Sequence, residues 1–221
     1  MKITTLKLYS KHLEKQKMFY SEVLHLPILS SDPSHFSTRI GYSKLHFTKD
    51  EKATPYHFAI NIPSFQENDA LQWLSQRVDL LKDGEHVLMD FENWNAKAMY
   101  FYDEDKNIVE FIARRPLNEP FKVPFNSSAL LGISEVGVVT DDISQTYAPL
   151  KHIGVEEFDG NYHRFLAAGN HQGLFIIINP NIKKWFPVND DAFYSPFELE
   201  IVQSSKKYQL QYTKNTMFVK A

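Results

Sequence analysis

Histidine and carboxylate side chains are the residues of this sequence best suited to chemistry. The chain has nine histidines and no cysteine, so disulfides, thiolate zinc sites and cysteine nucleophiles are excluded. Any metal must therefore be held by histidine and carboxylate. In residues 56–62, alternation separates large apolar residues from a small, polar face made of His57, Ala59 and Asn61. Such a face suits the wall of a cavity.

Two carboxylates lie in similar strand-like segments. Glu110 shares its face with Ile108 and Ile112, where an ionised carboxylate is costly unless it is paired or bound to a metal. Glu135 and Gly137 repeat the small, polar face seen at His57. These patterns make His57 and Glu110 candidate ligands and Glu135 a candidate pocket residue.

The elements that carry these residues repeat along the 221-residue chain. Period-2 alternation predicts a first strand at 3–9, and a helical pattern follows at about 11–24, then strands at 36–40 and 44–48. A second unit starts at 56–62, continues with a capping box at 64–67, and ends with the strand 108–112. A third unit runs from 134 to 178, and the segment 196–212 has strand patterns without a helix. The pattern predicts an α+β fold.

The units suggest a division of the chain into two halves. We expect residues 1–115 to hold modules one and two, enclosing one cup, and residues 129–221 to hold module three and a truncated module four. Residues 116–128 carry prolines without periodicity, which is typical of a linker.

Two motifs resemble a known family. Residues 11–27, KHLEKQKMFYSEVLHLP, and residues 100–112, YFYDEDKNIVEFI, are similar to motifs of the vicinal oxygen chelate superfamily, which includes glyoxalases, extradiol dioxygenases and bleomycin-resistance proteins. His25 and Lys106 stand where that family has glycine; His25 and the adjacent Asn107 are expected to make these turns, since His and Asn tolerate left-handed backbone. The resemblance implies tandem βαβββ modules whose mixed sheets curl into half-barrels with the helices outside.

The resemblance also implies a ligand set. In that family two modules form a half-barrel, and its metal ligands come from the first and last strands of each module. Aligning the units gives first-strand positions at Thr5, His57, Glu135 and Phe197, and last-strand positions at His46, Glu110 and Ile176. The register is consistent, because Thr5 to His46 and Glu135 to Ile176 both span 41 residues.

Applied to modules one and two, this alignment implies that His46, His57 and Glu110 hold a divalent Fe, Mn, Ni or Zn ion and leave open positions for substrate oxygens. Thr5 fills the remaining position, where it could orient substrate or water. Glu135 lacks matching partners and is expected to be a pocket-lining or structural carboxylate. The other pocket candidates are Ala59, Asn61, Trp94 and Asn95, and no residue is assigned as catalytic acid or base.

Two classes of function stay open. The first is a metal-dependent lyase, isomerase or dioxygenase acting on a small oxygen-rich organic molecule. The second is a metal-free protein that binds or sequesters a small aromatic or drug-like compound. A complete ligand set favours the enzyme, whereas Thr5 at a ligand position and the degenerate second half favour the binder.

Composition limits the partners. The net charge of −3 without a basic block argues against nucleic acid, and no stretch approaches the ~20 apolar residues of a membrane helix. The first residues lack the apolar core of a signal peptide, so we expect a cytoplasmic protein. A small-molecule substrate or ligand is the expected partner, and a homodimer is the candidate assembly. The chain has no phosphate-binding glycine loop, nucleophile elbow or H-E-x-x-H motif.

Overall fold

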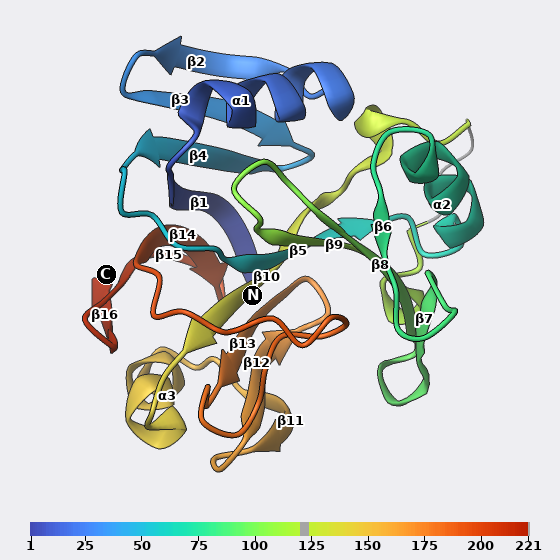
Figure 1. Cartoon of the computed structure of the whole chain (residues 1–221). Coiled ribbons are helices and arrows are strands. Elements are labelled where there is room, and N and C mark those ends of the chain that lie inside the picture. The colour runs from blue at the N-terminus through green and yellow to red at the C-terminus, as the bar shows by residue number, and fades with distance from the viewer. Residues whose placement is uncertain (120–123, 221) are drawn as a thin grey trace.

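The computed structural model describes residues 1–119 and 124–220. Two mixed β-sheets form the frame, and the helices pack against their outer surfaces (Figure 1). This arrangement is the α+β class of curved mixed sheets that the sequence predicts. The helices are α1 (Leu13–Met18), α2 (Glu67–Ser75) and α3 (Ile143–His152), and the strands are β1 (Lys2–Ser10), β2 (Ile28–Asp32), β3 (His35–Ile40), β4 (Ser43–Lys49), β5 (His57–Ile62), β6 (Leu80–Leu81), β7 (Met89–Phe91), β8 (Ala96–Tyr102), β9 (Ile108–Arg114), β10 (Gly132–Val139), β11 (Glu157–Asn161), β12 (Phe165–Asn170), β13 (Gly173–Ile178), β14 (Phe197–Gln203), β15 (Lys206–Thr213) and β16 (Thr216–Lys220).

The two sheets pair the modules differently from the expectation. A seven-stranded sheet has the order β16-β15-β14-β1-β4-β3-β2, and a nine-stranded sheet has the order β11-β12-β13-β10-β5-β9-β8-β6, with β7 paired to β8. Module one therefore shares a sheet with the helix-less module four, and module two shares a sheet with module three. The prediction that modules one and two enclose one cup is wrong. The reason is that the first strands of the modules pair over long sequence distances. β1 pairs antiparallel with β14, and β5 pairs antiparallel with β10, so the first strands of modules one and two do not pair with each other.

Strand register confirms the alignment of the modules in three places. In β5 and β9, Ala59 lies opposite Glu110, and in β10 and β13, Gly137 lies opposite Ile176. In β1 and β4, Lys7 lies opposite His46 in the same parallel arrangement. In the fourth module the observed register differs by one residue from the alignment. Lys7 of β1 pairs with Glu198, just as its equivalent Ala59 of β5 pairs with Glu135. The residue equivalent to Glu135 is therefore Glu198 and not Phe197.

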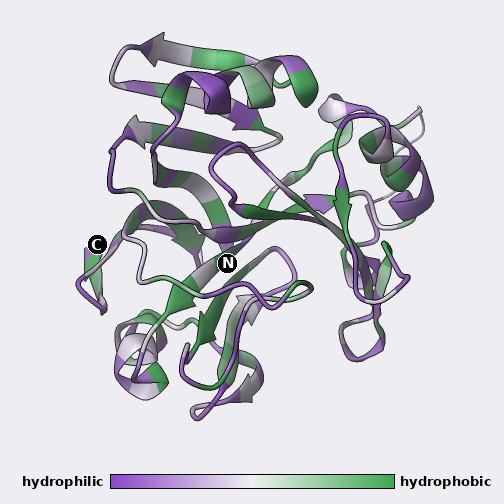
Figure 2. Ribbon diagram, viewed as in Figure 1, coloured by the Kyte–Doolittle hydropathy of each residue, from purple (hydrophilic) through white to green (hydrophobic). Residues whose placement is uncertain are grey.

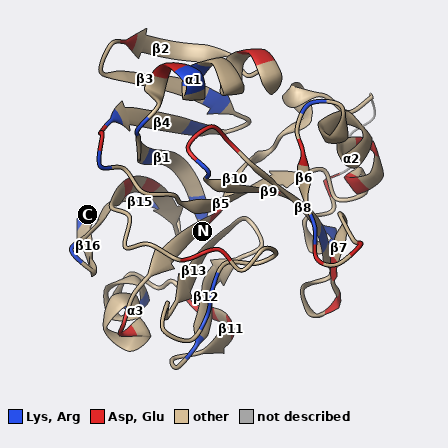
Figure 3. Ribbon diagram, viewed as in Figure 1, with Lys and Arg blue, Asp and Glu red and all other residues tan. Residues whose placement is uncertain are grey.

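The core lies between the sheets and their helices. Apolar and polar residues alternate along many strands in Figure 2, and acidic and basic residues are interspersed along the ribbon in Figure 3. On β5 the large residues Phe58, Ile60 and Ile62 are fully buried, as their alternation predicts. Helix α1 continues into a π-helical turn at Phe19–Val23 and packs on β3 and β4.

A buried carboxylate fixes the turn between β8 and β9. Asp103 accepts hydrogen bonds from the Tyr20 hydroxyl at 2.9 Å and from the side chain of Asn107 at 2.8 Å, and so ties the turn to the segment after α1. His25 and Lys106 adopt positive φ angles of 52° and 62°. The left-handed residue of the second turn is therefore Lys106 itself and not Asn107.

Ser64 does not cap α2, since the helix begins at Glu67 and the Ser64 hydroxyl accepts a hydrogen bond from the Glu119 amide. The boundaries 1–115, 116–128 and 129–221 stay a proposal, and residues 120–123 of the linker lie outside the described residues. Within the described ranges no helix has the length and apolarity needed to cross a membrane; the cytoplasmic location and the homodimer stay predictions.

Candidate functional site

A cavity of about 550 Å³ opens on one face of the nine-stranded sheet. Its floor is formed by side chains of β5, β8, β9, β10 and β13, and its rim by the segments around 90–94 and 183–186. Most of the wall is apolar or aromatic. The residues that line it are His57, Asp90, Phe91, Glu92, Asn93, Trp94, Tyr100, Glu110, Ile112, Glu135, Asp159, Phe165, Ile176, Lys183, Trp185 and Phe186.

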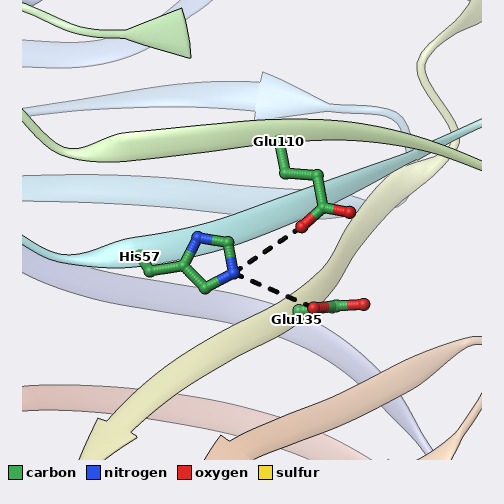
Figure 4. Close-up of side chains that lie close together, drawn as sticks. All are labelled: His57, Glu110 and Glu135. Carbon is green, nitrogen blue, oxygen red and sulfur yellow. Dashed lines mark ion pairs between the residues drawn. The ribbon is translucent and has the colours of Figure 1, made fainter. Parts of the chain in front are cut away.

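Three of these side chains converge on the cavity floor. The Nε2 atom of His57 lies 3.6 Å from Oε2 of Glu110 and 3.9 Å from Oε2 of Glu135 (Figure 4). One ligand atom from each residue lies within 4.8 Å of the others, and all three residues are buried. We call His57, Glu110 and Glu135 the candidate metal group.

The tautomer of His57 follows from its hydrogen bond. Its Nδ1 lies 3.1 Å from the backbone carbonyl of Ile108, which can only accept, so Nδ1 carries the proton. Burial lowers the pKa of His57 to about 4, which leaves the imidazole neutral at pH 7. Nε2 then points a lone pair at two carboxylate oxygens, at distances too long for hydrogen bonds. A neutral imidazole fixed through its other nitrogen is the form that binds metal ions.

The two carboxylates are held in an environment that disfavours their charge. Burial raises the pKa of Glu110 well above its ordinary value, and the neighbouring Glu135 raises it further. Burial also raises the pKa of Glu135, although the charge of Arg114 and its hydrogen bond act in the opposite direction. Tyr100, the cross-strand neighbour of Glu110, donates its hydroxyl to that carboxylate. A divalent cation would relieve the repulsion between the paired carboxylates.

The backbone register explains why the group has three members. His57 and Glu110 occupy the first-strand and last-strand positions of module two, and Glu135 occupies the first-strand position of module three. The fourth position is filled by Ile176, which is buried and offers no ligand atom. Ala59 lies opposite both Glu110 and Glu135 in the sheet, and its small side chain leaves room between them.

His46 and Thr5 lie in the other sheet, away from the candidate metal group. His46 on β4 stacks on His35, with ring centroids 5.0 Å apart, and its Nδ1 lies 2.9 Å from the Ser37 hydroxyl. The Thr5 hydroxyl donates to Glu200 at 3.0 Å. The expectation that His46 joins His57 and Glu110 is corrected by the topology, because β4 and β5 belong to different sheets.

The remaining predicted pocket residues are divided. Trp94 lines the cavity, whereas Asn95 follows it with a left-handed φ of 47° and ends the short helix that carries Trp94. Asn61 lies further along β5, where its side chain donates to the carbonyl of His171 at 3.0 Å. Glu135 lines the cavity, as expected of a pocket residue, and also belongs to the candidate metal group.

Three neighbours of the group were not assigned to it from the sequence. Trp185 packs on His57 with ring centroids 4.9 Å apart. Tyr100 and Arg114 contact the carboxylates from β8 and β9. Alternation along β9 provides the signal for Arg114, because Glu110, Ile112 and Arg114 share one face.

Comparison with solved structures identifies the fold. A proposed dioxygenase from Bacillus subtilis superposes with a TM-score of 0.60 at 15% identity, over 80% of this chain and 63% of that one, so the chain spans less than two thirds of that protein. A glyoxalase/bleomycin resistance protein/dioxygenase from Nocardioides matches 56% of this chain and 89% of its own length (20% identity, TM-score 0.43). A lactoylglutathione lyase from Agrobacterium tumefaciens matches 49% of this chain and 90% of its own length (18% identity, TM-score 0.41). No family model and no curated protein matches the sequence. At 15% identity, the likeness to the Bacillus subtilis structure shows a shared fold, and this is the kind of fold that the sequence resemblance implies.

Proposed function

We propose that this chain, which has the fold of the vicinal oxygen chelate proteins, is a divalent-metal-dependent enzyme that acts on a small oxygen-rich organic molecule as a lyase, isomerase or dioxygenase. The observation that carries the proposal is the unprotonated Nε2 of His57, which faces one oxygen each of Glu110 and Glu135. Three electron-pair donors facing one another in a buried place repel unless a proton or a metal cation lies among them, and a divalent cation can contact all three at once.

The donor set fits a metal ion. Bonds of about 2.0–2.2 Å place the ligand atoms of a metal about 3–4 Å apart, close to the two measured separations. One imidazole and two carboxylates suit Mn²⁺ or Fe²⁺ as well as Zn²⁺ or Ni²⁺, and the two carboxylates make Mn²⁺ the first ion to test. When bound, such an ion supplies Lewis-acid chemistry and open positions for two substrate oxygens.

The other residues of the cavity would orient the substrate and exclude water. At the cavity wall, the Tyr100 hydroxyl keeps its proton and donates a hydrogen bond to Glu110. Trp185 covers His57, and Trp94 and Phe186 form parts of the rim. These rings favour a molecule with planar or apolar surface beside its oxygen atoms.

A metal-free binding protein is the second candidate. Ile176 at the fourth ligand position and the aromatic rings around the cavity favour it. In that case the cavity would sequester a small aromatic compound, and the candidate metal group would share a proton instead of a metal ion.

Metal analysis of protein expressed without a histidine tag separates the two candidates. We expect about one divalent ion per chain in the parent and none in His57→Ala, whose folding is checked by circular dichroism because Trp185 packs on the imidazole that it removes. His46→Ala is the matched control, since it removes a strand histidine from the other sheet and should keep the metal. If a small molecule binds the parent and His57→Ala equally tightly, with and without chelator, the protein is a binder and the metal proposal is wrong.

A further inference from the structure

We propose that Arg114 is a positioning residue that orients Glu135 toward the metal, so that one carboxylate oxygen is committed to the guanidinium and the other faces His57. This inference rests on the proposed function. Arg114 ends β9 on the same face as Glu110 and is fully buried. It adds a cationic side chain to a group that so far holds one imidazole and two carboxylates.

The contacts of Glu135 divide its two oxygens. Arg114 Nη2 donates to Oε1 of Glu135 in a buried ion pair, whereas Oε2 of Glu135 is the oxygen that lies 3.9 Å from His57 Nε2. A carboxylate fixed through one oxygen can rotate little, so its second oxygen stays aimed at the position between His57 and Glu110. Partners behind the ligands commonly orient them in metal sites, and their loss costs about 10- to 100-fold in metal affinity.

The other contacts of Arg114 do not favour a purely structural role. Its Nε and Nη1 atoms are buried and have no hydrogen-bond partner within residues 1–119 and 124–220. The guanidinium carbon lies 5.4 Å from the ring centroid of Trp94, which lines the cavity. Unsatisfied buried donors are costly, and a buried ion pair rarely stabilises a fold more than apolar side chains of the same size would. The pair with Glu135 is the contact that accounts for a charged residue at this position.

Its sequence neighbour Arg115 offers a matched comparison. Arg115 forms the same kind of ion pair, with Nη1 donating to Glu67 at 2.9 Å, but Glu67 belongs to α2 and does not line the cavity. Replacing Arg115 removes a guanidinium and an ion pair without touching the candidate metal group.

A double-mutant cycle on Mn²⁺ affinity tests the proposal. Metal-free parent, Arg114→Met, Glu135→Gln and the double variant are titrated with Mn²⁺ by calorimetry, with circular dichroism as the check on folding. R114M should weaken Mn²⁺ binding about 10- to 100-fold in the parent background and have no further effect in E135Q. Arg114→Lys should restore part of the affinity, because it keeps the charge but not the planar fork. Arg115→Met should bind Mn²⁺ like the parent.

Each outcome decides the proposal. Equal Mn²⁺ affinity in R114M and the parent overturns it, and so does a loss of the same size in the E135Q background, since Arg114 would then not act through Glu135. If R114M does not fold, R114K takes its place in the cycle. R114K should then weaken Mn²⁺ binding in the parent background, and this loss of affinity should disappear in the E135Q background. A parent that binds none of Mn²⁺, Fe²⁺, Ni²⁺ and Zn²⁺ refutes the proposed function, and the positioning role with it, whereas a parent that binds Mn²⁺ as tightly as R114M refutes the positioning role alone.

Discussion

Glu110→Gln should make the metal-free protein more stable at neutral pH while it removes a ligand. Two carboxylates share the buried group with one guanidinium, so one negative charge is left uncompensated when both are ionised. Glutamine keeps the shape of Glu110 and an oxygen that can accept the Tyr100 hydroxyl. The substitution removes the negative charge of Glu110. Burial and the nearby Glu135 disfavour this charge, and both therefore raise the pKa of Glu110.

The sign and size of the effect follow from proton linkage. A carboxyl whose pKa is raised by folding adds stability that is fully present below its unfolded pKa, here 4.5, and is lost as the pH rises through its folded pKa. While the folded chain keeps one more proton than the unfolded chain, the free energy of unfolding falls by about 1.4 kcal/mol per pH unit. Between about pH 5.5 and about pH 7.5, the parent should therefore lose up to about 3 kcal/mol relative to E110Q.

Urea denaturation in EDTA at several pH values measures this difference. Glu67→Gln is the control, because hydrogen bonds and charge from Arg115 outweigh burial and lower the pKa of Glu67. Its difference from the parent should be a loss of stability that does not grow over this pH range. Parallel stability curves for the parent and E110Q would refute the reasoning, since they would mean that Glu110 keeps no extra proton on folding.

Three further substitutions test the surroundings of the site and the fold. Gly137→Ala would place a Cβ 2.7 Å from Cη2 of Trp185, so it should cost about 1–3 kcal/mol in urea denaturation and change the tryptophan fluorescence; unchanged fluorescence would contradict the packing. Asp103→Asn should lower the stability by about 2–4 kcal/mol, because five donated hydrogen bonds reach its two oxygens and an amide cannot accept them all; a loss below about 1 kcal/mol would show that the turn does not depend on them. Ile176→Glu adds a carboxylate at the position equivalent to Glu110 and should destabilise the metal-free chain by about 3 kcal/mol, with the loss recovered when Mn²⁺ is added; a loss that Mn²⁺ does not recover would place Ile176 outside the metal's reach.

The strand–helix order of the modules, and the strand register of the first three, could be predicted from the sequence. Alternation with a period of two marks which residues of a strand share a face, and it made His57 equivalent to Glu135 and Glu110 to Ile176. The pairing of β5 with β9 and of β10 with β13 confirms both equivalences. These are local properties, so a single sequence carries them.

The partnership of the modules could not be predicted in the same way. The first strands of the modules have similar alternating patterns, and nothing local decides which of them pair antiparallel. That choice depends on contacts between distant segments, such as Leu6 with Leu199 across β1 and β14. The family resemblance, applied to neighbouring modules, places modules one and two in one cup, which brings His46 into the ligand set and leaves Glu135 out of it.

The binding of one divalent ion by His57, Glu110 and Glu135 is tested most directly by equilibrium dialysis of the metal-free protein against Mn²⁺. The parent should retain about one ion per chain, and E110Q, which should fold at least as stably, should retain none at the same free concentration. A parent that retains no ion, or an E110Q variant that retains one as tightly as the parent, would contradict the assignment of these three residues as a metal site.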